Sequence, residues 1–385
     1  MTIVLISLEP WDDMWRRNQF LCDGLLSRSE TTKILFVQPP YDNSYAMRSS
    51  NLAKIQFSAT LLSDGYDTRL QLFTPTKWFP NSLPLGRKLN DIFLANQVKG
   101  ALASLGWSAT HLWVNQHEAA GLLDEGIAIQ SIYDITDDWT TFSGNQAHLE
   151  VVKSQDYKLC VGATQVIVCS EQLLSDKHDL VESKYLHLIP NGVHVDHYVS
   201  VTDNSKQLHP VTLDWQKPVY GYTGTIHGDR VDVNLVAEIA KSYPNATIAL
   251  VGPNLLVADD QARLSKHTNI VFTGAMPYSE LPDIMRAFDV CMVPHVVTSF
   301  TESLNPIKLW EYLAAGKPIV STNVAGFRDF PELVHVAESY GGFLRNLDSA
   351  LNEDSSLAVA RKAVARQHSW DKRIDQVIQI LGVSA

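Results

Sequence analysis

The chain has 385 residues, of which 45% are hydrophobic and 19% charged, and its formal net charge is -11. A length of this order predicts two or three domains. The acidic balance argues against a general nucleic-acid-binding protein, because such proteins need a basic surface. The four cysteines lie far apart and are interpreted as buried, reduced thiols. The N-terminus lacks the basic region of a signal peptide, and no apolar run has the ~20 residues that span a bilayer, so we expect a cytoplasmic protein.

The first half of the chain alternates short apolar runs with helical patterns. Strands are expected at residues 3–8, 34–37, 111–114, 131–133, 165–168 and 185–189. Helices are expected at residues 15–27, 88–104, 147–160 and 171–180. Such alternation is typical of parallel βαβ units.

The second half repeats this scheme. Strands are expected at residues 219–220, 247–251, 270–273, 289–293, 319–321 and 334–336. Helices are expected at residues 233–242, 279–287 and 306–315, followed by an isolated amphipathic helix at 370–381. The polar segment 194–216 is interpreted as the linker between two α/β halves. Within it, His194, Asp196 and His197 are interpreted as hinge residues rather than metal ligands.

The most informative stretch is NPIKLWEYLAAGKPIV, residues 305–320. Pro306 suits the first turn of a helix and Gly316 suits its end, so Lys308 and Glu311 lie on one helix face. Strands before and after this helix put its start at the carboxyl edge of a parallel sheet, where open α/β sheets bind ligands. The helix start and the lysine suit a phosphate, and the carboxylate suits ribose hydroxyls. The alternative is an ordinary surface ion pair.

The two halves, with this stretch in the second, resemble the GT-B glycosyltransferases of the family-4-type group, and more closely enzymes of teichuronic acid and exopolysaccharide synthesis. The motifs that carry the resemblance cover nearly the whole chain: EPWDDMWRRNQF, YDITDDW, IPNGVHVDHY, GYTGTIHGD, VFTGAMPYSELPDIMRAFDVCMVPH, NPIKLWEYLAAGKPIV and HSWDKRIDQV. The resemblance implies an α/β protein of two Rossmann-like, doubly wound parallel-sheet domains that face a cleft. We expect an acceptor domain at residues 1–200, a nucleotide-sugar domain at 201–368, and a C-terminal helix at 369–385 that packs back on the acceptor domain.

The second domain of this family holds the donor, a nucleotide sugar. Glycine lets a phosphate approach the backbone closely, so GYTGTIHGD is expected to hold the diphosphate; a tight strand-to-helix turn is the alternative explanation. Lys308 is also expected to act in catalysis, because its charge and the helix dipole would stabilise the departing nucleoside diphosphate. No cofactor and no metal is therefore expected. The expected donor-binding residues are Gly221, Gly224, Gly252, Tyr278, Asn305, Lys308 and Glu311.

Three aspartates of YDITDDW form the densest carboxylate cluster of the first half. An inverting transfer needs a carboxylate that takes the proton from the acceptor hydroxyl. We expect Asp137 to be this base, with Asp138 as the next choice and Asp134 at the acceptor. Capping of a helix is the alternative role for one of them. The other expected acceptor-binding residues follow strands at the same edge: Trp11, Arg16, Arg17 and His117.

The family's pattern is incomplete at one position. Retaining members carry two glutamates eight positions apart, and Glu311 matches the second of them. Ser303 stands at the first position, and Glu302 lies one position away. The sequence therefore leaves open whether the transfer retains or inverts the anomeric configuration.

The segment KWFPNSLPLGRK, residues 77–88, mixes apolar side chains with Lys77, Arg87 and Lys88. It suits either peripheral contact with the inner face of the plasma membrane or packing as a loop of the first domain. The resemblance implies transfer of a sugar from a nucleotide sugar to a hydroxyl of a glycan or lipid-linked acceptor in cell-surface polysaccharide synthesis. The alternatives are a sugar-nucleotide epimerase of the same fold and a non-catalytic nucleotide-sugar-binding protein.

Overall fold

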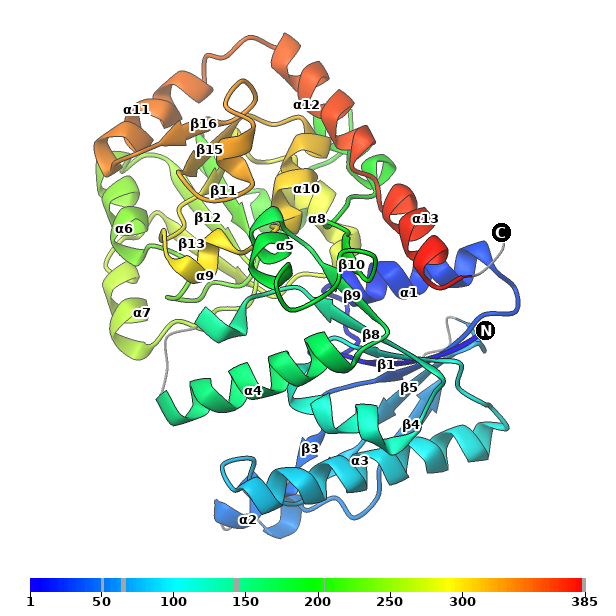
Figure 1. Cartoon of the computed structure of the whole chain (residues 1–385). Helices are drawn as coiled ribbons and strands as arrows, with labels where there is room; N and C mark the ends of the chain where they lie inside the picture. The colour runs from blue at the N-terminus through cyan, green and yellow to red at the C-terminus, as the bar shows by residue number, and fades with distance from the viewer. Residues whose placement is uncertain (50–51, 64–66, 142–145, 204, 383–385) are drawn as a thin grey trace. The chain divides into compact units, whose positions relative to one another are not determined.

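Two separate sheets organise the chain (Figure 1). The computed structural model describes residues 1–49, 52–63, 67–141, 146–203 and 205–382. The chain divides into two compact units: unit 1 consists of Met1–Asp12, Arg16–Pro190 and Ile374–Ala385, and unit 2 of Asp13–Trp15 and Asn191–Arg373. The division after Pro190 lies ahead of the boundary expected at residue 200.

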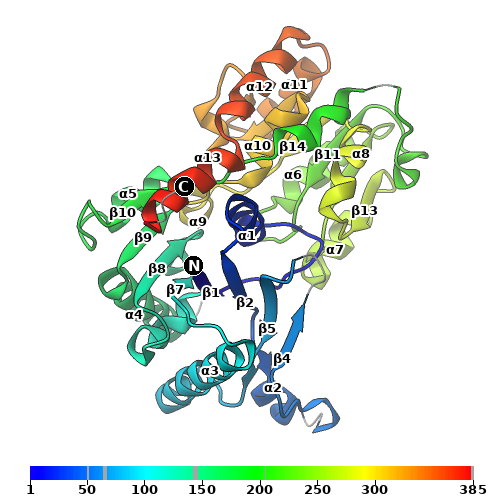
Figure 2. The same cartoon turned by 90° about the vertical axis from the view of Figure 1, so that its right-hand side faces the viewer.

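Unit 1 contains an eight-stranded sheet in the order β10-β9-β8-β7-β1-β2-β5-β4. Neighbouring strands are parallel except for the antiparallel pair β4–β5, and Figure 2 shows β1, β2, β5 and β4 following one another. The strands are β1 (Thr2–Ile6), β2 (Lys33–Val37), β4 (Thr60–Ser63), β5 (Leu70–Thr74), β7 (His111–Val114), β8 (Gln130–Ile135), β9 (Gln165–Val168) and β10 (Leu186–Leu188), with a separate pair β3 (Tyr41–Asp42) and β6 (Thr76–Lys77). The sequence analysis did not expect β4 or β5.

Helices cover both faces of this sheet. The helices of unit 1 are α1 (Arg17–Arg28), α2 (Asn43–Arg48), α3 (Pro84–Leu105), α4 (Gln146–Gly162), α5 (Glu171–Lys177), the 3₁₀ helix η2 (His117–Glu125) and most of α13 (Trp370–Ile380). Alternate strand residues such as Val4 and Val114 pack with α3, α4 and η2 in one apolar cluster. Figure 1 shows α1 and α13 side by side on the other side. A Cβ on Gly24 of α1 would lie 1.7 Å from Ile374 of α13, so this contact needs a glycine.

Unit 2 contains a six-stranded parallel sheet in the order β13-β12-β11-β14-β15-β16. Its strands are β11 (Val219–Thr223), β12 (Thr247–Val251), β13 (Ile270–Gly274), β14 (Val290–Val293), β15 (Ile319–Thr322) and β16 (His335–Ala337). Its helices are α6 (Val233–Ser242), α7 (Ala258–Leu264), α8 (Leu281–Met285), α9 (Ser299–Glu302), α10 (Ile307–Ala315), α11 (Tyr340–Ala350) and α12 (Ser356–Gln367). Helices α11 and α12 were not predicted from the sequence.

Both faces of the central strands β11, β12 and β14 are buried, which explains why these strands are largely apolar. On one face Val219 and Val293 pack with α8, α10 and α12. On the other face Tyr220 and Met292 pack with α6 and α11. The expected doubly wound α/β architecture, repeated in two domains, is confirmed.

The polar segment 194–216 is not a free linker, contrary to the expectation. Its first part forms the 3₁₀ helix η4 (Val195–Thr202) inside unit 2. Tyr198 and Val201 are buried in the same apolar cluster as helix α10. His197 Nε2 donates a hydrogen bond to the carbonyl oxygen of Tyr278 at 2.9 Å, so the expected hinge residues belong to a packed element.

Two expectations drawn from composition can be compared with the structure. All four cysteines are free and buried, as predicted. Among the residues that the structure describes, no helix has both the length and the apolar character needed to cross a membrane.

Candidate active site

The start of helix α10 carries the two charged residues on which the donor prediction rests. The helix begins after Pro306 and ends at Gly316, whose φ is 69°, as predicted. Lys308 lies in the first turn, and its Nζ is 3.1 Å from the place that a Cβ on Gly224 would occupy. The first amides of a helix and a lysine ammonium both favour a bound anion. This end of α10 can therefore bind a phosphate group.

Gly224 and Gly252 follow the carboxyl ends of β11 and β12. Their φ angles are 130° and 144°, which side chains other than glycine rarely adopt. A Cβ on Gly252 would lie 2.2 Å from the carbonyl oxygen of Gly224, and the Gly224 amide donates to the Val251 carbonyl at 2.8 Å. The structure thus brings three of the expected donor-binding residues, Gly224, Gly252 and Lys308, to one edge of the sheet.

A second cation and a neutral histidine lie close to Lys308. The Lys308 Nζ is 5.4 Å from the centre of the Tyr222 ring, and the Tyr222 hydroxyl is hydrogen-bonded to Nε2 of the buried His295 at 3.3 Å. Burial lowers the pKa of His295 well below its usual value, and the charges of Lys308 and Arg230 lower it further. The imidazole is therefore neutral, and Lys308 and Arg230 both act on it.

Glu311 is almost entirely buried one turn after Lys308. Its side chain is 9% exposed, and its Oε1 accepts a hydrogen bond from the buried Tyr198 hydroxyl at 2.8 Å. Burial raises the pKa of Glu311, while the Tyr198 hydrogen bond and the positive charge of Lys308 oppose this rise. The result is a positioned carboxyl group that can exchange hydrogen bonds with hydroxyl groups.

Tyr278 lies in an aromatic stack. Its ring lies 4.1 Å from that of His197 at an interplanar angle of 19°, and 5.8 Å from that of Trp15 at 15°. The Tyr278 amide donates to the Asp13 carbonyl at 2.8 Å. The Tyr278 ring also lies 6.4 Å from that of Tyr198, which donates to Glu311, so the structure brings these two expected donor-binding residues into one neighbourhood.

Two expected donor-binding residues have a structural role instead. Gly221 lies inside β11, where a Cβ would come within 2.3 Å of the Phe288 ring, so this glycine is needed for helix–sheet packing. The Asn305 side-chain oxygen accepts hydrogen bonds from the Asn191 amide at 2.9 Å and from the Trp310 indole at 3.3 Å. Asn305 therefore fixes the loop before α10, and a contact of its side chain with the donor stays a prediction.

Ser303 and Glu302, the two positions that could correspond to the family's first glutamate, have different surroundings. Ser303 is buried, and its hydroxyl donates to the Phe300 carbonyl at 2.8 Å. Glu302, the last residue of α9, forms an ion pair with Arg328. A carboxylate is thus present at Glu302, but a guanidinium group already compensates its charge.

Arg17 and Asp134 bind each other inside unit 1. Arg17 is 4% exposed and Asp134 is 0% exposed. The Arg17 Nε donates to Asp134 Oδ2 at 3.0 Å, and Nη2 donates to Oδ1 at 3.0 Å. Removing either partner would leave a buried charge uncompensated. Both residues were expected to bind the acceptor, and the structure corrects this: they join helix α1 to strand β8.

The two remaining aspartates of YDITDDW differ from each other. Asp138 is buried, and its Oδ1 accepts hydrogen bonds from the amide of Thr140 at 3.0 Å and from its hydroxyl, so it caps the following turn rather than acting as a base. Asp137 is partly exposed. His117 follows the neighbouring strand, and its ring lies 6.4 Å from that of Trp139. Asp137 and His117 therefore remain candidates at the carboxyl edge of the first sheet.

The other two expected acceptor-binding residues lie in the loop after β1. Trp11 packs edge-on against Phe36 with ring centres 5.1 Å apart. Arg16 forms ion pairs with Asp12 at 2.9 Å and with Glu9 at 3.4 Å. These partners compensate the charge of Arg16, which weakens the expectation that it binds an anionic group.

In the described parts of the chain, no three His, Cys, Asp or Glu side chains are placed to hold one metal ion. That the reaction needs no metal stays a prediction.

Three comparisons place this site among known proteins. Residues 217–350 match the family described as Glycosyl transferases group 1. Over 271 residues the chain is 26% identical to a Bacillus subtilis (strain 168) protein named as a teichuronic acid biosynthesis glycosyltransferase, TuaH, and the match covers 66% of this chain and 67% of that protein. The structure matches sucrose-phosphate synthase from Thermosynechococcus elongatus with a TM-score of 0.70 and 15% identity over 99% of this chain and 98% of that one. It also matches Anabaena Alr3699/HepE in complex with UDP and glucose, with a TM-score of 0.63 and 16% identity over 99% of each chain.

Residues 217–350 belong to the Glycosyl transferases group 1 family, and the chain is a glycosyltransferase of the GT-B fold. The matched family segment contains helix α10 with Lys308 and Glu311 and the strands β11 and β12 with their glycines, whereas η4, which supplies Tyr198, and α12 lie outside it. The resemblance seen in the sequence is thus confirmed at the level of family and fold.

Sequence reasoning missed Tyr198, His295 and Arg230 in this glycosyltransferase. A signal for Tyr198 was present, because the apolar residues at 195, 198 and 201 have the three-residue spacing of a 3₁₀ helix. No comparable pattern distinguishes Arg230 from an ordinary surface arginine, since its role depends on which strand ends lie beside it.

Proposed function

We propose that this glycosyltransferase moves a sugar from a nucleotide sugar to a hydroxyl of a glycan or lipid-linked acceptor during synthesis of a cell-surface polysaccharide. Two comparisons support the finer parts of this proposal. The name of the Bacillus relative refers to teichuronic acid biosynthesis, and the HepE structure contains UDP and glucose.

One observation carries the donor part of the proposal: Lys308 lies beside Gly224, which itself contacts Gly252, at the start of α10, and Glu311 is buried one turn later. A diphosphate would lie against Lys308 and the open backbone at the two glycines. The ribose hydroxyls would exchange hydrogen bonds with Glu311, which Tyr198 holds in place.

We propose that the leaving nucleoside diphosphate needs no divalent metal. Charge develops on the diphosphate as the glycosidic bond breaks, and donors fixed in advance at that position stabilise it. Lys308 and the first amides of α10 supply positive charge there.

The proposed stereochemical course is inversion, with Asp137 as the base that takes the proton from the acceptor hydroxyl. The surroundings of the alternative carboxylate support this course, because Glu302 is paired with Arg328 and Ser303 offers no carboxylate. If the transfer instead retains the configuration, Glu302 is the displaced first glutamate and Asp137 holds a sugar.

The acceptor side of the proposal includes peripheral contact with the inner face of the plasma membrane through the segment 77–88. Leu83 and Leu85 at the start of α3 are 58% and 69% exposed, and Lys88 in the next turn is exposed as well. Exposed aliphatic side chains with a neighbouring cation suit the surface of an anionic bilayer. Such contact would bring a lipid-linked acceptor to unit 1.

Lys308→Ala should lower the turnover number by about 10²–10³, the usual effect of removing one donor that stabilises developing charge, while the melting temperature changes little. Lys241→Ala, which removes an exposed lysine of α6, is the control. Near-normal turnover in Lys308→Ala would exclude the leaving-group role.

Wild-type transfer should persist in excess EDTA, because the leaving group is stabilised without a metal. Loss of wild-type activity in EDTA, with recovery in magnesium or manganese, would exclude the metal-free mechanism.

Asp137→Asn should lower the rate of transfer by about 10²–10⁴, as expected for loss of a general base, and leave donor affinity unchanged. The anomeric configuration of the product, read by NMR against that of the donor, should be inverted. A product of retained configuration would refute the inverting course and reassign Asp137 to sugar binding.

Replacement of Leu83 and Leu85 together by serine should reduce co-sedimentation with phosphatidylglycerol vesicles more than tenfold, because each buried aliphatic side chain contributes roughly 1.5–3 kcal/mol. Leu351→Ser, at a leucine of unit 2 that is 40% exposed, is the matched control. Equal sedimentation of the double variant and the control would rule out this contact.

A further inference from the structure

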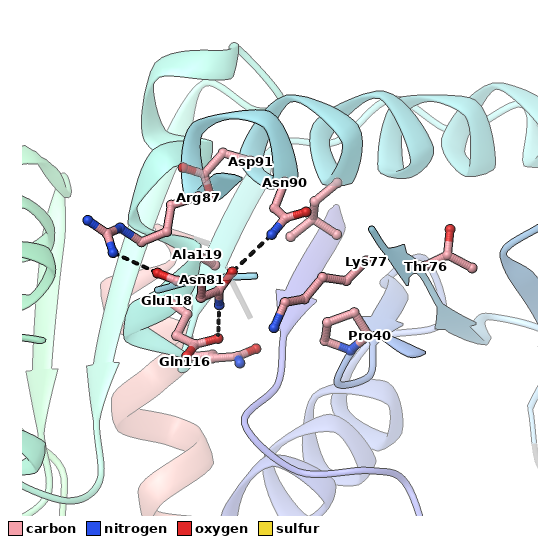
Figure 3. A pocket seen from close by; sticks show the side chains of 11 residues that line it. Pro40, Thr76, Lys77, Asn81, Arg87, Asn90, Asp91, Gln116, Glu118 and Ala119 are labelled. Carbon is pink, nitrogen blue, oxygen red and sulfur yellow. Dashed lines mark hydrogen bonds between the residues drawn. The ribbon is translucent and has the colours of Figure 1, made fainter. Parts of the chain in front are cut away.

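A pocket in unit 1 has no role in the function proposed so far (Figure 3). It holds about 490 Å³ of empty space, part of which is open to solvent. Its walls come from β6, from the first turns of α3 and from the residues that follow β7. Because β5 and β7 are parallel strands of one sheet, the segments that follow them meet at its carboxyl edge, where open α/β sheets bind ligands.

One wall of the pocket is a fixed network of hydrogen bonds. The Asn90 side chain donates to Asn81 Oδ1 at 2.9 Å and to the Phe79 carbonyl at 2.8 Å. Asn81 in turn donates to Glu118 Oε2 at 2.9 Å, as Figure 3 shows. The network ties the first turns of α3 to the start of η2, so the pocket keeps its shape without a ligand.

Two polar side chains of the pocket, Gln116 and Asp91, are partly exposed and available to a ligand. Within the described part of the chain, neither the Gln116 amide nor the Asp91 carboxyl has a hydrogen-bond partner. Burial raises the pKa of Asp91 to about 6; Glu125 and Asp124 add to this rise, and Lys158 and Arg87 oppose it. Near that pH the carboxyl group can donate a hydrogen bond as well as accept one.

The charges around the pocket are balanced, which limits the kind of ligand. Lys77 is paired with Asp42 at 3.2 Å, and the positive Arg87 lies in the electrostatic field of Asp91. A phosphate or a carboxylate would meet Glu118 and Asp91, whereas an ammonium group would meet Lys77 and Arg87. A neutral ligand with several hydroxyl groups meets no such repulsion and matches the amide and carboxyl groups.

We infer that this pocket binds a neutral sugar residue of the acceptor, with Gln116 and Asp91 as the groups that hydrogen-bond its hydroxyls. The inference rests on the proposed function, since only a transferase with a carbohydrate acceptor needs such a subsite. It adds a place and a chemical class: the glycan part of the acceptor is uncharged where it enters the pocket.

Saturation-transfer NMR on the full chain tests the inference with methyl glucoside, methyl galactoside and methyl N-acetylglucosaminide as neutral probes, and with methyl glucuronoside and methyl phosphate as anionic ones. At least one neutral glycoside should bind. Its affinity should fall about tenfold or more in Gln116→Ala and in Asp91→Ala, and should be unchanged in Gln172→Ala, which alters an exposed glutamine of α5.

Binding of UDP, GDP and ADP to the same samples reports on unit 2 alone and separates the two proposals. A protein that binds a nucleotide but no neutral glycoside overturns the pocket inference and leaves the donor site standing. The inference is also overturned if only the anionic probes bind, or if both pocket variants bind the neutral glycoside as the wild type does. Loss of all nucleotide binding in the wild type would instead contradict the proposed function.

Discussion

The hydrogen bond from Tyr198 to Glu311 is the interaction on which the donor site depends. A buried carboxyl group without a partner costs free energy comparable to several ordinary contacts, so Glu311 can stay buried in α10 only while Tyr198 lies against it. This requirement fixes η4 on α10 and fills the apolar cluster of unit 2. Lys308, one turn earlier on the same helix, is then held beside the open backbone at Gly224.

Much of this arrangement could be predicted from local sequence patterns. Apolar runs buried on both faces identify parallel strands, which is why β7, β9 and β12 have the bounds expected for them. The limits of α10 also follow from local chemistry, because Pro306 and Gly316 act within one turn of themselves. The expectation that Lys308 and Gly224 both lie at the donor site came from a less direct argument, the rule that ligands bind at the carboxyl ends of strands.

The side-chain partners could not be predicted, because they depend on residues far away in the sequence. A carboxylate after a strand looks the same whether it faces solvent or an arginine, and the partner of Asp134 is Arg17, 117 positions away. Gly221 belongs to a glycine-rich segment that resembles a phosphate-binding turn, yet the Phe288 ring fills the space beside it. The polar residues after 194 suggested a linker, although Tyr198 among them packs in the core of unit 2.

Glu311 is proposed to bind the ribose of the donor, and a calorimetric comparison of UDP with its 2′,3′-dideoxy analogue tests this most directly. Wild-type protein should bind the analogue roughly 10- to 100-fold more weakly, because hydrogen bonds to a charged group are worth about 1.5–3 kcal/mol. Glu311→Ala should bind both nucleotides with equal affinity. If the wild type does not distinguish them, or if Glu311→Ala still prefers UDP by the wild-type factor, Glu311 does not bind the ribose.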